Sequence, residues 1–474
     1  MTAFDLIVIG AGPAGATAAA AASEQGLRVA LIDEAHAPGG QVYRAPAGGV
    51  VPSKLDADAL AGQALRGRVV RSGAIWLSGR RVWSVSRGFR VDTAGAHGPE
   101  TFTAPRLIAA TGAHERVVPF PGWTLPGVIG LAAATVLIKS QGMLPGGRCV
   151  IAGCGPLLAA VAAKVAAGGG DIAAVVDLAG ASDWLESVPA LARRPRLLTR
   201  GIGWAIEIGR KRVPVYFRHG IRSASGSDRI ERVRIGPVDA ARVPLQSGGM
   251  EIAADVLVVG HGLVPGAEIP RLLRAEIIFD RRRGGWVPRC DEAGRCSIPG
   301  LFAAGDGAGI RGAEPSALAG ELAGLAAATG ARPAFDDHII SRVAELQRQL
   351  ASYRPFADAV ADMMALQPSH AAAVGADTVV CRCEDVTRAE IDAAARDGAH
   401  DVNQLKQFTR CGMGPCQGRM CGDVTAELLA LARNTPRETV GYWTGRPPLR
   451  PFPLEDLVGR FSYSDIPIPK PAPL

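Results

Sequence analysis

Five of the nine cysteines of this 474-residue chain gather near its C-terminal end. They are Cys381, Cys383, Cys411, Cys416 and Cys421. In a reducing compartment, clustered thiols indicate metal ligation rather than disulfides. Four thiolates bind either zinc or an iron–sulfur cluster, so one of the five is surplus. The opening Cys-x-Cys is tight for a structural zinc site, and the glycine-rich turns around the later cysteines leave backbone N–H groups free for cluster sulfurs. The pattern favours an iron–sulfur cluster over zinc.

The segment between these cysteines predicts a small helical scaffold. Thr387 and Glu390 have the spacing of a capping box, which predicts a helix over residues 391–396. Gly398 follows as a stop signal, and a second helix is expected over residues 403–408. These helices would hold the cysteine-bearing turns together.

A glycine turn near the N-terminus is the second group of residues suited to chemistry. It lies between an apolar strand expected at residues 6–9 and an alanine-rich helix, and another apolar strand follows at residues 29–32. The turn contains Gly10, Gly12, Pro13, Ala14 and Gly15. Glycines there permit the tight turn, the approach of a pyrophosphate and close helix packing. Asp33, followed by Glu34, ends the second strand, where a carboxylate can bind an adenosine ribose. The unit predicts a dinucleotide site.

Three distant segments indicate which dinucleotide binds. They contain Gly40 and Gln41, Thr111 and Gly112, and Gly305 and Asp306. The set resembles the flavoprotein family with two dinucleotide-binding domains that includes glutathione and thioredoxin reductases. The resemblance implies an α/β fold with two Rossmann-like domains, FAD in the N-terminal site, and a contact between Asp306 and the flavin ribitol.

A second strand, turn, helix and strand unit carries Gly153 and Gly155. Leu158 stands where the third glycine is expected, and Ala160 replaces the glutamate of that family's NAD(P) motif. Asp177 ends the following strand and would repel a 2′-phosphate, so any nicotinamide use should favour NAD over NADP. We interpret the unit as a structural or noncatalytic nucleotide site. The chain has no Cys-x-x-Cys, so a thioredoxin reductase-like dithiol relay is not expected.

The cysteine region resembles the small helical [2Fe-2S] domain of bacterioferritin-associated ferredoxin, in which Cys-x-Cys precedes a second cysteine pair. The spacing from Cys383 favours Cys416 over Cys411 as the start of that pair. The resemblance therefore implies Cys381, Cys383, Cys416 and Cys421 as ligands, with Cys411 as the alternative.

Nearly the whole chain resembles the FAD and [2Fe-2S] large subunit of bacterial heteromeric amine dehydrogenases, the family of opine oxidases, D-hydroxyproline and L-proline dehydrogenases and hydrogen cyanide synthase. The matching stretches lie at residues 39–44, 110–123 and 411–421. The resemblance implies a smaller FAD-dependent partner, similar to D-amino-acid oxidase, that oxidises the C–N bond. It allows a further small subunit, an FMN between subunits, and NAD or ATP in the second site. Electrons would pass to a quinone or the respiratory chain.

No catalytic residue is assigned, because the sequence offers no nucleophile, acid and base constellation. His114 and Arg116 are the polar residues expected near the flavin, with a structural role equally open for each. The leading hypothesis is a subunit that relays electrons from a partner's amine or imino-acid oxidation. The alternatives are a self-sufficient NAD(P)H-dependent FAD reductase of a ferredoxin-like or disulfide acceptor, and a redox sensor that uses its cluster to report iron or oxygen.

The composition of the chain restricts where the protein is expected in the cell and which kinds of partner it binds. The net charge of +7 is spread along the chain, which argues against nucleic acid binding. No apolar run reaches the length of a membrane-spanning helix, and the first strand has no basic leader. We expect a cytoplasmic protein, peripheral at the inner membrane only through its electron acceptor.

Five regions are expected along the chain. They are an FAD-binding domain formed by residues 1–118 and 275–330, a second nucleotide-binding-like domain at 119–274, a helical linker at 331–375, a helical [2Fe-2S] domain at 376–432 and a Pro-rich tail at 433–474.

Overall fold

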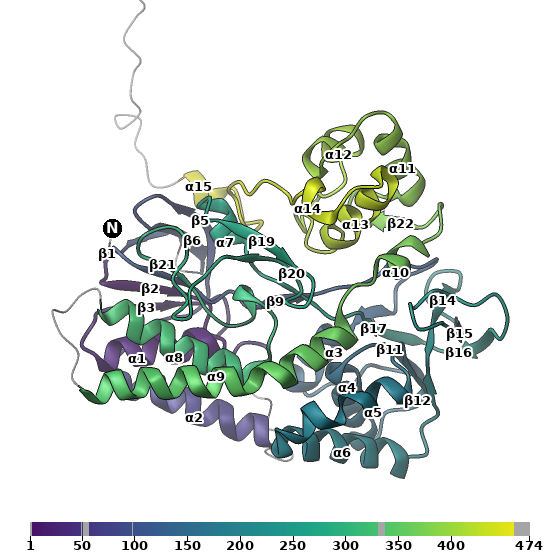
Figure 1. The fold of residues 1–474 in the computed structure, drawn as a ribbon, viewed down its shortest axis with the longest axis horizontal. Coiled ribbons are helices and arrows are strands. Elements are labelled where there is room, and N and C mark those ends of the chain that lie inside the picture. The colour runs from purple at the N-terminus through teal and green to yellow at the C-terminus, as the bar shows by residue number, and fades with distance from the viewer. Residues whose placement is uncertain (1, 49, 51–55, 97, 330–336, 459–474) are drawn as a thin grey trace, which may run out of the picture.

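The computed structural model describes residues 2–48, 50, 56–96, 98–329 and 337–458. The start of the predicted linker (residues 331–336) and the end of the predicted tail (residues 459–474) lie outside the described residues. Two parallel sheets, each flanked by helices, form the body of the molecule, and a group of short helices lies above it (Figure 1). This arrangement confirms the predicted α/β fold with two Rossmann-like domains and a small helical C-terminal region. The exact domain boundaries stay predictions.

The first parallel sheet forms from short apolar runs, which are almost completely buried in four of its five strands. Its strand order is β21 (Leu301–Ala303), β8 (Leu107–Ala109), β2 (Leu6–Ile9), β3 (Val29–Ile32) and β4 (Ile75–Leu77). α1 (Pro13–Glu24) connects β2 to β3, which confirms the predicted strand, turn, helix and strand unit. α2 (Ala57–Ser72) packs beside α1. The carboxyl ends of β2, β3 and β8 meet at one edge, where parallel sheets of this class bind ligands.

Small residues allow α1 to pack closely against α8 (Ala313–Thr329), which lies next to it in Figure 1. A Cβ on Gly320 would lie 2.0 Å from the carbonyl oxygen of Ala14, and a Cβ on Gly324 would lie 2.3 Å from that of Ala18. Since backbone atoms of the dinucleotide turn are involved, α8 fixes the position of that turn.

We expect Gly320→Ala to destabilise the protein by about 1–3 kcal/mol, because the added methyl group must displace the backbone of α1. The matched control is Gly201→Ala in α6 (Pro195–Arg210), where an added Cβ would meet nothing within 4 Å. There the better helix propensity of alanine should stabilise the protein by up to about 1 kcal/mol. Thermal unfolding checks both substitutions. Equal midpoints for the two variants would contradict the close-packing account.

A four-stranded sheet packs against the first parallel sheet and shares its core. Its order is β1 (Thr2–Ala3), β7 (Glu100–Thr103), β6 (Arg90–Gly95) and β5 (Arg80–Ser86). Buried side chains from both sheets, including Ile7, Val85 and Phe102, form one cluster. This sheet places β5 beside the carboxyl edge of the parallel sheet.

The second parallel sheet repeats the plan of the first. Its order is β10 (Val128–Gly130), β17 (Val256–Gly260), β11 (Cys149–Gly153), β12 (Ile172–Asp177) and β13 (Val215–Phe217). The helices of this half are α3 (Leu131–Gln141), α4 (Pro156–Ala167), α5 (Ala181–Ala192) and α6. An antiparallel sheet of β14 (His219–Ser225), β15 (Arg232–Pro237) and β16 (Met250–Ala253) lies at its end. The second predicted unit is thus confirmed by β11, α4 and β12.

Two antiparallel ribbons complete the body. They pair β9 (Ala113–Glu115) with β18 (Leu263–Pro265), and β19 (Ile277–Asp280) with β20 (Gly285–Pro288). The chain passes through β9 on its way to the second parallel sheet and through β18 on its return. A short helix, α7 (Glu268–Leu272), follows β18, and a 3-10 turn, η1 (Gly305–Ala308), follows β21.

The long helix α9 (Asp337–Met364) contacts α8 at one end and α5 at the other, so it spans both halves (Figure 1). α10 (Pro368–Ala372) then leads into the C-terminal region, which contains β22 (Val379–Cys381), β23 (Val386–Thr387), α11 (Arg388–Arg396), α12 (Val402–Thr409), α13 (Gly422–Arg433), α14 (Arg437–Val440) and α15 (Glu455–Val458). No helix within the described ranges is long and apolar enough to cross a membrane.

Both helices predicted between the cysteines are present. Thr387 caps α11 and accepts from the backbone N–H of Glu390, while the Glu390 carboxylate accepts from the N–H of Thr387, which confirms the capping box. Asp401 caps α12, and Ile391 and Leu405 pack with no exposed surface in the core of this region. The sequence between the cysteines therefore builds a compact support for the cysteine turns.

Candidate functional site

The first glycine turn requires glycine at two positions, because of the backbone conformation at Gly10 and because of the lack of space at Gly15. Gly10 has a φ of 97°, and a Cβ there would lie 2.2 Å from the carbonyl oxygen of Ala110. A Cβ on Gly15 would lie 1.7 Å from the carbonyl oxygen of Gly10. α1 begins directly after the turn at Pro13, so its free N–H groups and positive dipole end face the carboxyl edge of the sheet. This is the geometry of a pyrophosphate site.

Asp33 is held against this turn. Its carboxylate accepts from the backbone N–H of Ala11 at 2.5 Å and from that of Ala35 at 2.8 Å. Burial raises the pKa of Asp33, while the two backbone hydrogen bonds lower it. The acidic residue is therefore placed within reach of a ribose bound along the turn, as the sequence predicts.

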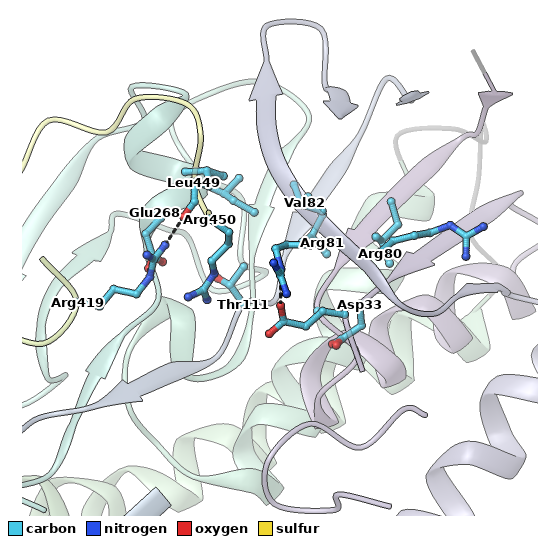
Figure 2. Close-up of a pocket in the computed structure, with 14 residues that line it drawn as sticks. Asp33, Arg80, Arg81, Val82, Thr111, Glu268, Arg419, Leu449 and Arg450 are labelled. Carbon is cyan, nitrogen blue, oxygen red and sulfur yellow. Dashed lines mark hydrogen bonds and ion pairs between the residues drawn. The ribbon is translucent and has the colours of Figure 1, made fainter. Parts of the chain in front are cut away.

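A cavity opens beside the turn and is lined by residues from seven separate segments of the chain (Figure 2). From the predicted set it is lined by Gly10, Asp33, Glu34 and Thr111. Its other polar lining residues, Arg80, Arg81, Glu268, Arg419 and Arg450, were not predicted. Arg419 belongs to the turn between Cys416 and Cys421, and its Nε donates to the Glu268 carboxylate at 2.8 Å. The cysteine region thus reaches the dinucleotide cavity directly.

The remaining predicted residues of the first site surround the glycine turn without lining this cavity. A Cβ on Gly40 would lie 2.7 Å from the Cα of Gly12, and one on Gly305 would lie 2.6 Å from the Cβ of Ala14. Gln41 is exposed, and its side chain makes a polar contact only with Arg44 in the part of the chain that the structure describes.

Asp306 lies just before α8. Its carboxylate accepts from the N–H groups of Arg311 and Gly312 at 2.9 and 3.0 Å. Burial raises its pKa, while these hydrogen bonds lower it. A Cβ on the next residue, Gly307, would lie 3.3 Å from the carbonyl oxygen of Gly112, so the Asp306 and Thr111 segments are adjacent. The fold therefore brings all the predicted segments of the first site together.

The second glycine turn has a different environment. Gly153 has a φ of 142°, and a Cβ there would lie 1.8 Å from the carbonyl oxygen of Gly260. A Cβ on Gly155 would lie 2.6 Å from Cγ of Met364, the last residue of α9. The Arg242 guanidinium donates to the carbonyls of Met363 and Ala365, which fixes the end of α9 over the turn. A methionine side chain thus covers the position that a pyrophosphate would approach.

The carboxylate of Asp177 is also already hydrogen-bonded within the protein. The residue is 5% exposed, and its carboxylate accepts from the backbone N–H of Ala179 at 2.9 Å and from Trp184 Nε1 at 3.0 Å. Burial raises its pKa to about 6. The carboxylate is thus engaged by the protein itself rather than presented to a ribose.

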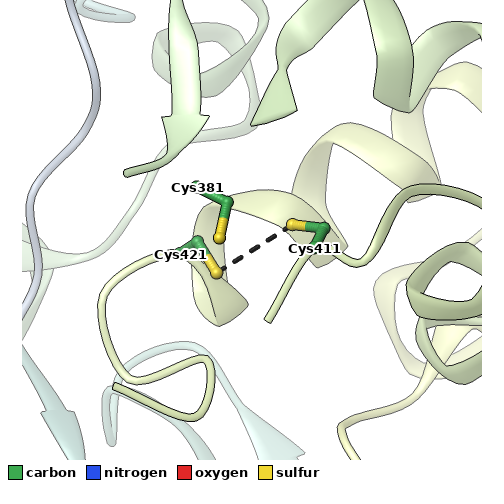
Figure 3. A group of neighbouring side chains, drawn as sticks. All are labelled: Cys381, Cys411 and Cys421. Carbon is green, nitrogen blue, oxygen red and sulfur yellow. Dashed lines mark hydrogen bonds between the residues drawn. The ribbon is translucent and has the colours of Figure 1, made fainter. Parts of the chain in front are cut away.

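The cysteines form two adjacent groups. The sulfur atoms of Cys381, Cys411 and Cys421 all lie within 4.8 Å of one another and are buried (Figure 3). Hydrogen bonds from the other two thiols lower the pKa of Cys381 to about 2. Cys383 is hydrogen-bonded to Cys416, and burial raises the Cys383 pKa. The structure brings together both the predicted ligands and Cys411, so the choice of four among the five thiols stays a prediction.

His114 and Arg116 play different parts. Burial lowers the pKa of His114 to about 4, so it is neutral near pH 7. Arg116 is 4% exposed and donates from Nε to the Asp423 carboxylate at 2.6 Å, and from its other nitrogens to backbone carbonyls, including that of Gly284 at 2.9 Å. Asp423 follows Cys421 by two residues, so Arg116 joins the cysteine region to the body of the protein. Its role here is structural.

Glu115, next to Arg116, is a half-buried acid for which the sequence predicts no role. A Cβ on Gly130 would lie 2.0 Å from its Oε2, and one on Gly260 would lie 2.4 Å from its Oε1, so these glycines make room for the carboxyl group. It accepts from the backbone N–H of Ala132 in the first turn of α3 at 3.2 Å. Burial nevertheless raises its pKa from 4.5 to about 7.

The raised pKa of Glu115 predicts a pH-dependent stability. Because the folded chain binds this proton more tightly than the unfolded chain, the stabilisation is fully present below pH 4.5 and is lost as the pH rises through about 7. The loss should be about 3 kcal/mol. Glu115→Gln keeps the shape but cannot ionise, so it should remove this part of the pH dependence. Unfolding measured between pH 5 and 8 checks this, and identical slopes for both proteins would rule it out.

Comparison with known proteins gives consistent results. Residues 4–351 match the pyridine nucleotide-disulphide oxidoreductase family, and residues 376–460 match the sarcosine oxidase A3 domain. An opine oxidase subunit of Rhizobium meliloti is 37% identical over 96% of this chain and 99% of its own length. Hydrogen cyanide synthase subunit HcnB of Pseudomonas aeruginosa is 33% identical over 94% of this chain and 97% of its own length.

Solved structures share the fold. L-proline dehydrogenase from P. horikoshii superposes with a TM-score of 0.70 over 96% of this chain and 79% of its own, at 19% identity. Thioredoxin reductase from T. acidophilum superposes with a TM-score of 0.51 over 70% of this chain and 99% of its own, also at 19% identity. The chain therefore belongs to the pyridine nucleotide-disulphide oxidoreductase family of FAD-dependent oxidoreductases and, within it, to the group of heteromeric flavoprotein large subunits that contains this opine oxidase subunit and HcnB.

Proposed function

We propose that the chain is the electron-transferring subunit of a heteromeric FAD-dependent dehydrogenase for amines or imino acids of the opine, hydroxyproline or proline type. The observation that carries this proposal is the direct contact between the cysteine region and the dinucleotide cavity through Arg419. A relay needs its two redox centres close together, and this turn lies between two of the proposed cluster ligands.

The residues of the first site fit FAD. The glycine turn at the start of α1 would hold the pyrophosphate, Asp33 and Glu34 the adenosine ribose, and Asp306 the ribitol, with Gly40, Gln41, Thr111 and Gly112 around the flavin. The tight approaches at Gly10 and Gly15 support this assignment, because side chains there would close the turn.

The cysteine region fits a [2Fe-2S] cluster. We assign Cys381, Cys383, Cys416 and Cys421 as ligands and keep Cys411 as the alternative. Burial of three thiols within 4.8 Å supports a metal centre, because soft thiolate ligands suit iron–sulfur clusters. When bound, FAD accepts two electrons as a hydride and the cluster passes one at a time, so the pair would convert hydride chemistry into single-electron flow.

The second glycine turn argues against the self-sufficient NAD(P)H-dependent reductase. Such an enzyme needs an open nicotinamide site, whereas Met364 covers the turn and Asp177 is hydrogen-bonded to Trp184. NAD or ATP would enter this turn only after the Met364 side chain had moved away from Gly155. The electrons would therefore come from another subunit.

We propose that this subunit is a smaller flavoprotein, similar to D-amino-acid oxidase, that oxidises the C–N bond. An FMN at the subunit interface and a further small subunit are optional components of the complex. The relatives support a complex, because two of them are themselves named as subunits. We assign no catalytic residue to this chain. A quinone or the respiratory chain would accept the electrons, from a cytoplasmic complex peripheral to the inner membrane.

Co-purification with a tagged chain tests the proposal. We expect a smaller flavoprotein to accompany the chain, and the complex to reduce an artificial acceptor with an opine, proline or hydroxyproline but not with NADH. Rapid reduction of the acceptor by the purified chain with NADH alone would contradict the relay and favour the self-sufficient reductase.

A further inference from the structure

The C-terminal segment at residues 442–453, which we call the strap, runs from the cysteine turns to β5 of the four-stranded sheet. At its start, Trp443 covers the cysteine turns. A Cβ on Gly418 would lie 2.4 Å from its indole Nε1, and one on Gly422 would lie 2.5 Å from it, so the ring fits only because both residues are glycine. At its far end, Phe452 stacks on Trp83 of β5, with ring centroids 4.9 Å apart and planes inclined by 23°. The strap therefore contacts both redox regions.

Hydrogen bonds fix the middle of the strap. The N–H of Leu449 donates to the carbonyl oxygen of Trp83 at 2.7 Å, and the Arg419 guanidinium donates to the carbonyl oxygen of Leu449 at 2.6 Å. Gln417 Nε2 donates to the carbonyl oxygen of Pro448 at 2.6 Å. Leu449 is 7% exposed and belongs to the core of the first domain. The strap is thus docked by main-chain and apolar contacts.

This docking places Leu449 and Arg450 in the wall of the dinucleotide cavity (Figure 2). The other three arginines of that wall have carboxylate partners, and Arg80 pairs with Glu100 at 2.7 Å. Arg419 pairs with Glu268 at 2.8 Å, and Arg81 pairs with Glu34 at 3.5 Å. Arg450 makes no hydrogen bond or ion pair with any residue that the structure describes. Its guanidinium therefore remains free for an anion entering the cavity.

We propose that the strap is part of the cofactor site, that Arg450 pairs with the diphosphate of FAD, and that release of FAD requires the strap to lift from Trp83. This inference rests on the proposed function, because it takes FAD as the occupant of the cavity. A guanidinium matches a phosphate with two parallel hydrogen bonds, and the diphosphate is the charged part of FAD. The stacking of Phe452 on Trp83 would keep Arg450 over the cavity.

Three substitutions in the full-length chain test the strap. Arg450→Ala should raise the dissociation constant of FAD about tenfold, because one charge-assisted contact is lost. Phe452→Ala keeps the arginine but loosens the strap, and should speed FAD release roughly threefold to tenfold. Arg446→Ala removes the same charge from an exposed strap residue that does not line the cavity, and should change neither value. Flavin fluorescence after dilution of the holoprotein measures release, and titration of the apoprotein measures affinity.

The outcomes separate this inference from the proposed function. Weaker FAD binding in Arg450→Ala with unchanged binding in Arg446→Ala supports the strap. If the natural chain binds FAD and all three variants bind and release it equally well, the strap plays no part in the site and the inference is overturned. A natural chain that bound no FAD at all would instead overturn the proposed function.

Discussion

Replacing Cys381 or Cys421 with alanine should abolish the iron content of the purified chain and the iron–sulfur part of its visible absorption. The flavin and its own absorption should stay in place. Both residues belong to the proposed ligand set and to the buried group of three thiols. Removal of either leaves the cluster without one of its four thiolates. Metal analysis and a visible spectrum measure the change. The control is Cys290→Ala, since Cys290 lies outside the cysteine region and contacts Cys296 instead.

The same measurements on variants of Cys416 and Cys411 show which of these two cysteines is a cluster ligand. With Cys381, Cys383, Cys416 and Cys421 as ligands, Cys416→Ala should lose the cluster and Cys411→Ala should keep it. The reverse result would move the site to the buried group of three and make Cys411 a ligand. An unchanged iron content in both Cys381→Ala and Cys421→Ala would show that these thiols do not hold iron, and the relay would lose its second centre.

The second large effect concerns the buried ion pair between Arg116 and Asp423. We expect Arg116→Ala to destabilise the attachment of the cysteine region by about 3–5 kcal/mol, because it leaves Asp423 buried with one of its two arginines missing. Backbone carbonyls of Gly284 and Met364 also lose a donor. The remaining arginine, Arg437, is 3.0 Å from Asp423 and 3% exposed.

Native-state hydrogen exchange in α13 measures this effect, because it reports the free energy of local opening. Arg282→Ala is the matched control. It breaks an ion pair with Asp362 whose side chains are 62% and 52% exposed. Because water screens this pair, its loss should leave the opening of α13 nearly unchanged. If the two variants opened with the same free energy, Arg116 would not be the anchor of the cysteine region.

Local patterns in the sequence predict most of the secondary structure near the sites. The glycine turn, Asp33 and the two strands around them lie within one short unit, so their geometry follows from steric limits that act over a few residues. The capping box at Thr387 likewise predicts the start of α11, because both of its hydrogen bonds are local.

Contacts between distant segments could not be predicted. Met364 covers Gly155 because α9 ends there, and nothing in either local sequence reports that meeting. Arg419 and Arg450 reach the dinucleotide cavity only because the cysteine region folds back on the first domain. Arg116 follows the Thr111–Gly112 turn in sequence, which suggested a place near the flavin, yet its side chain points to Asp423. Pairings of this kind depend on tertiary packing rather than on sequence spacing.

Cys411 illustrates the same limit. The spacing of the cysteines in the sequence favours Cys416 as a ligand. In the folded chain, however, the buried sulfur of Cys411 lies within 4.8 Å of those of Cys381 and Cys421. Cys411 directly follows Arg410, the residue that ends α12 with a φ of 63°, and the spacing of the cysteines does not report this turn.

Low-temperature electron paramagnetic resonance of the co-purified complex tests the central claim most directly. Anaerobic addition of an opine, proline or hydroxyproline should produce the signal of a reduced [2Fe-2S] cluster in the complex, and the isolated chain should stay silent with the same compounds and with NADH. A cluster that NADH reduces in the isolated chain as fast as the amine does in the complex would contradict a relay fed by a partner subunit.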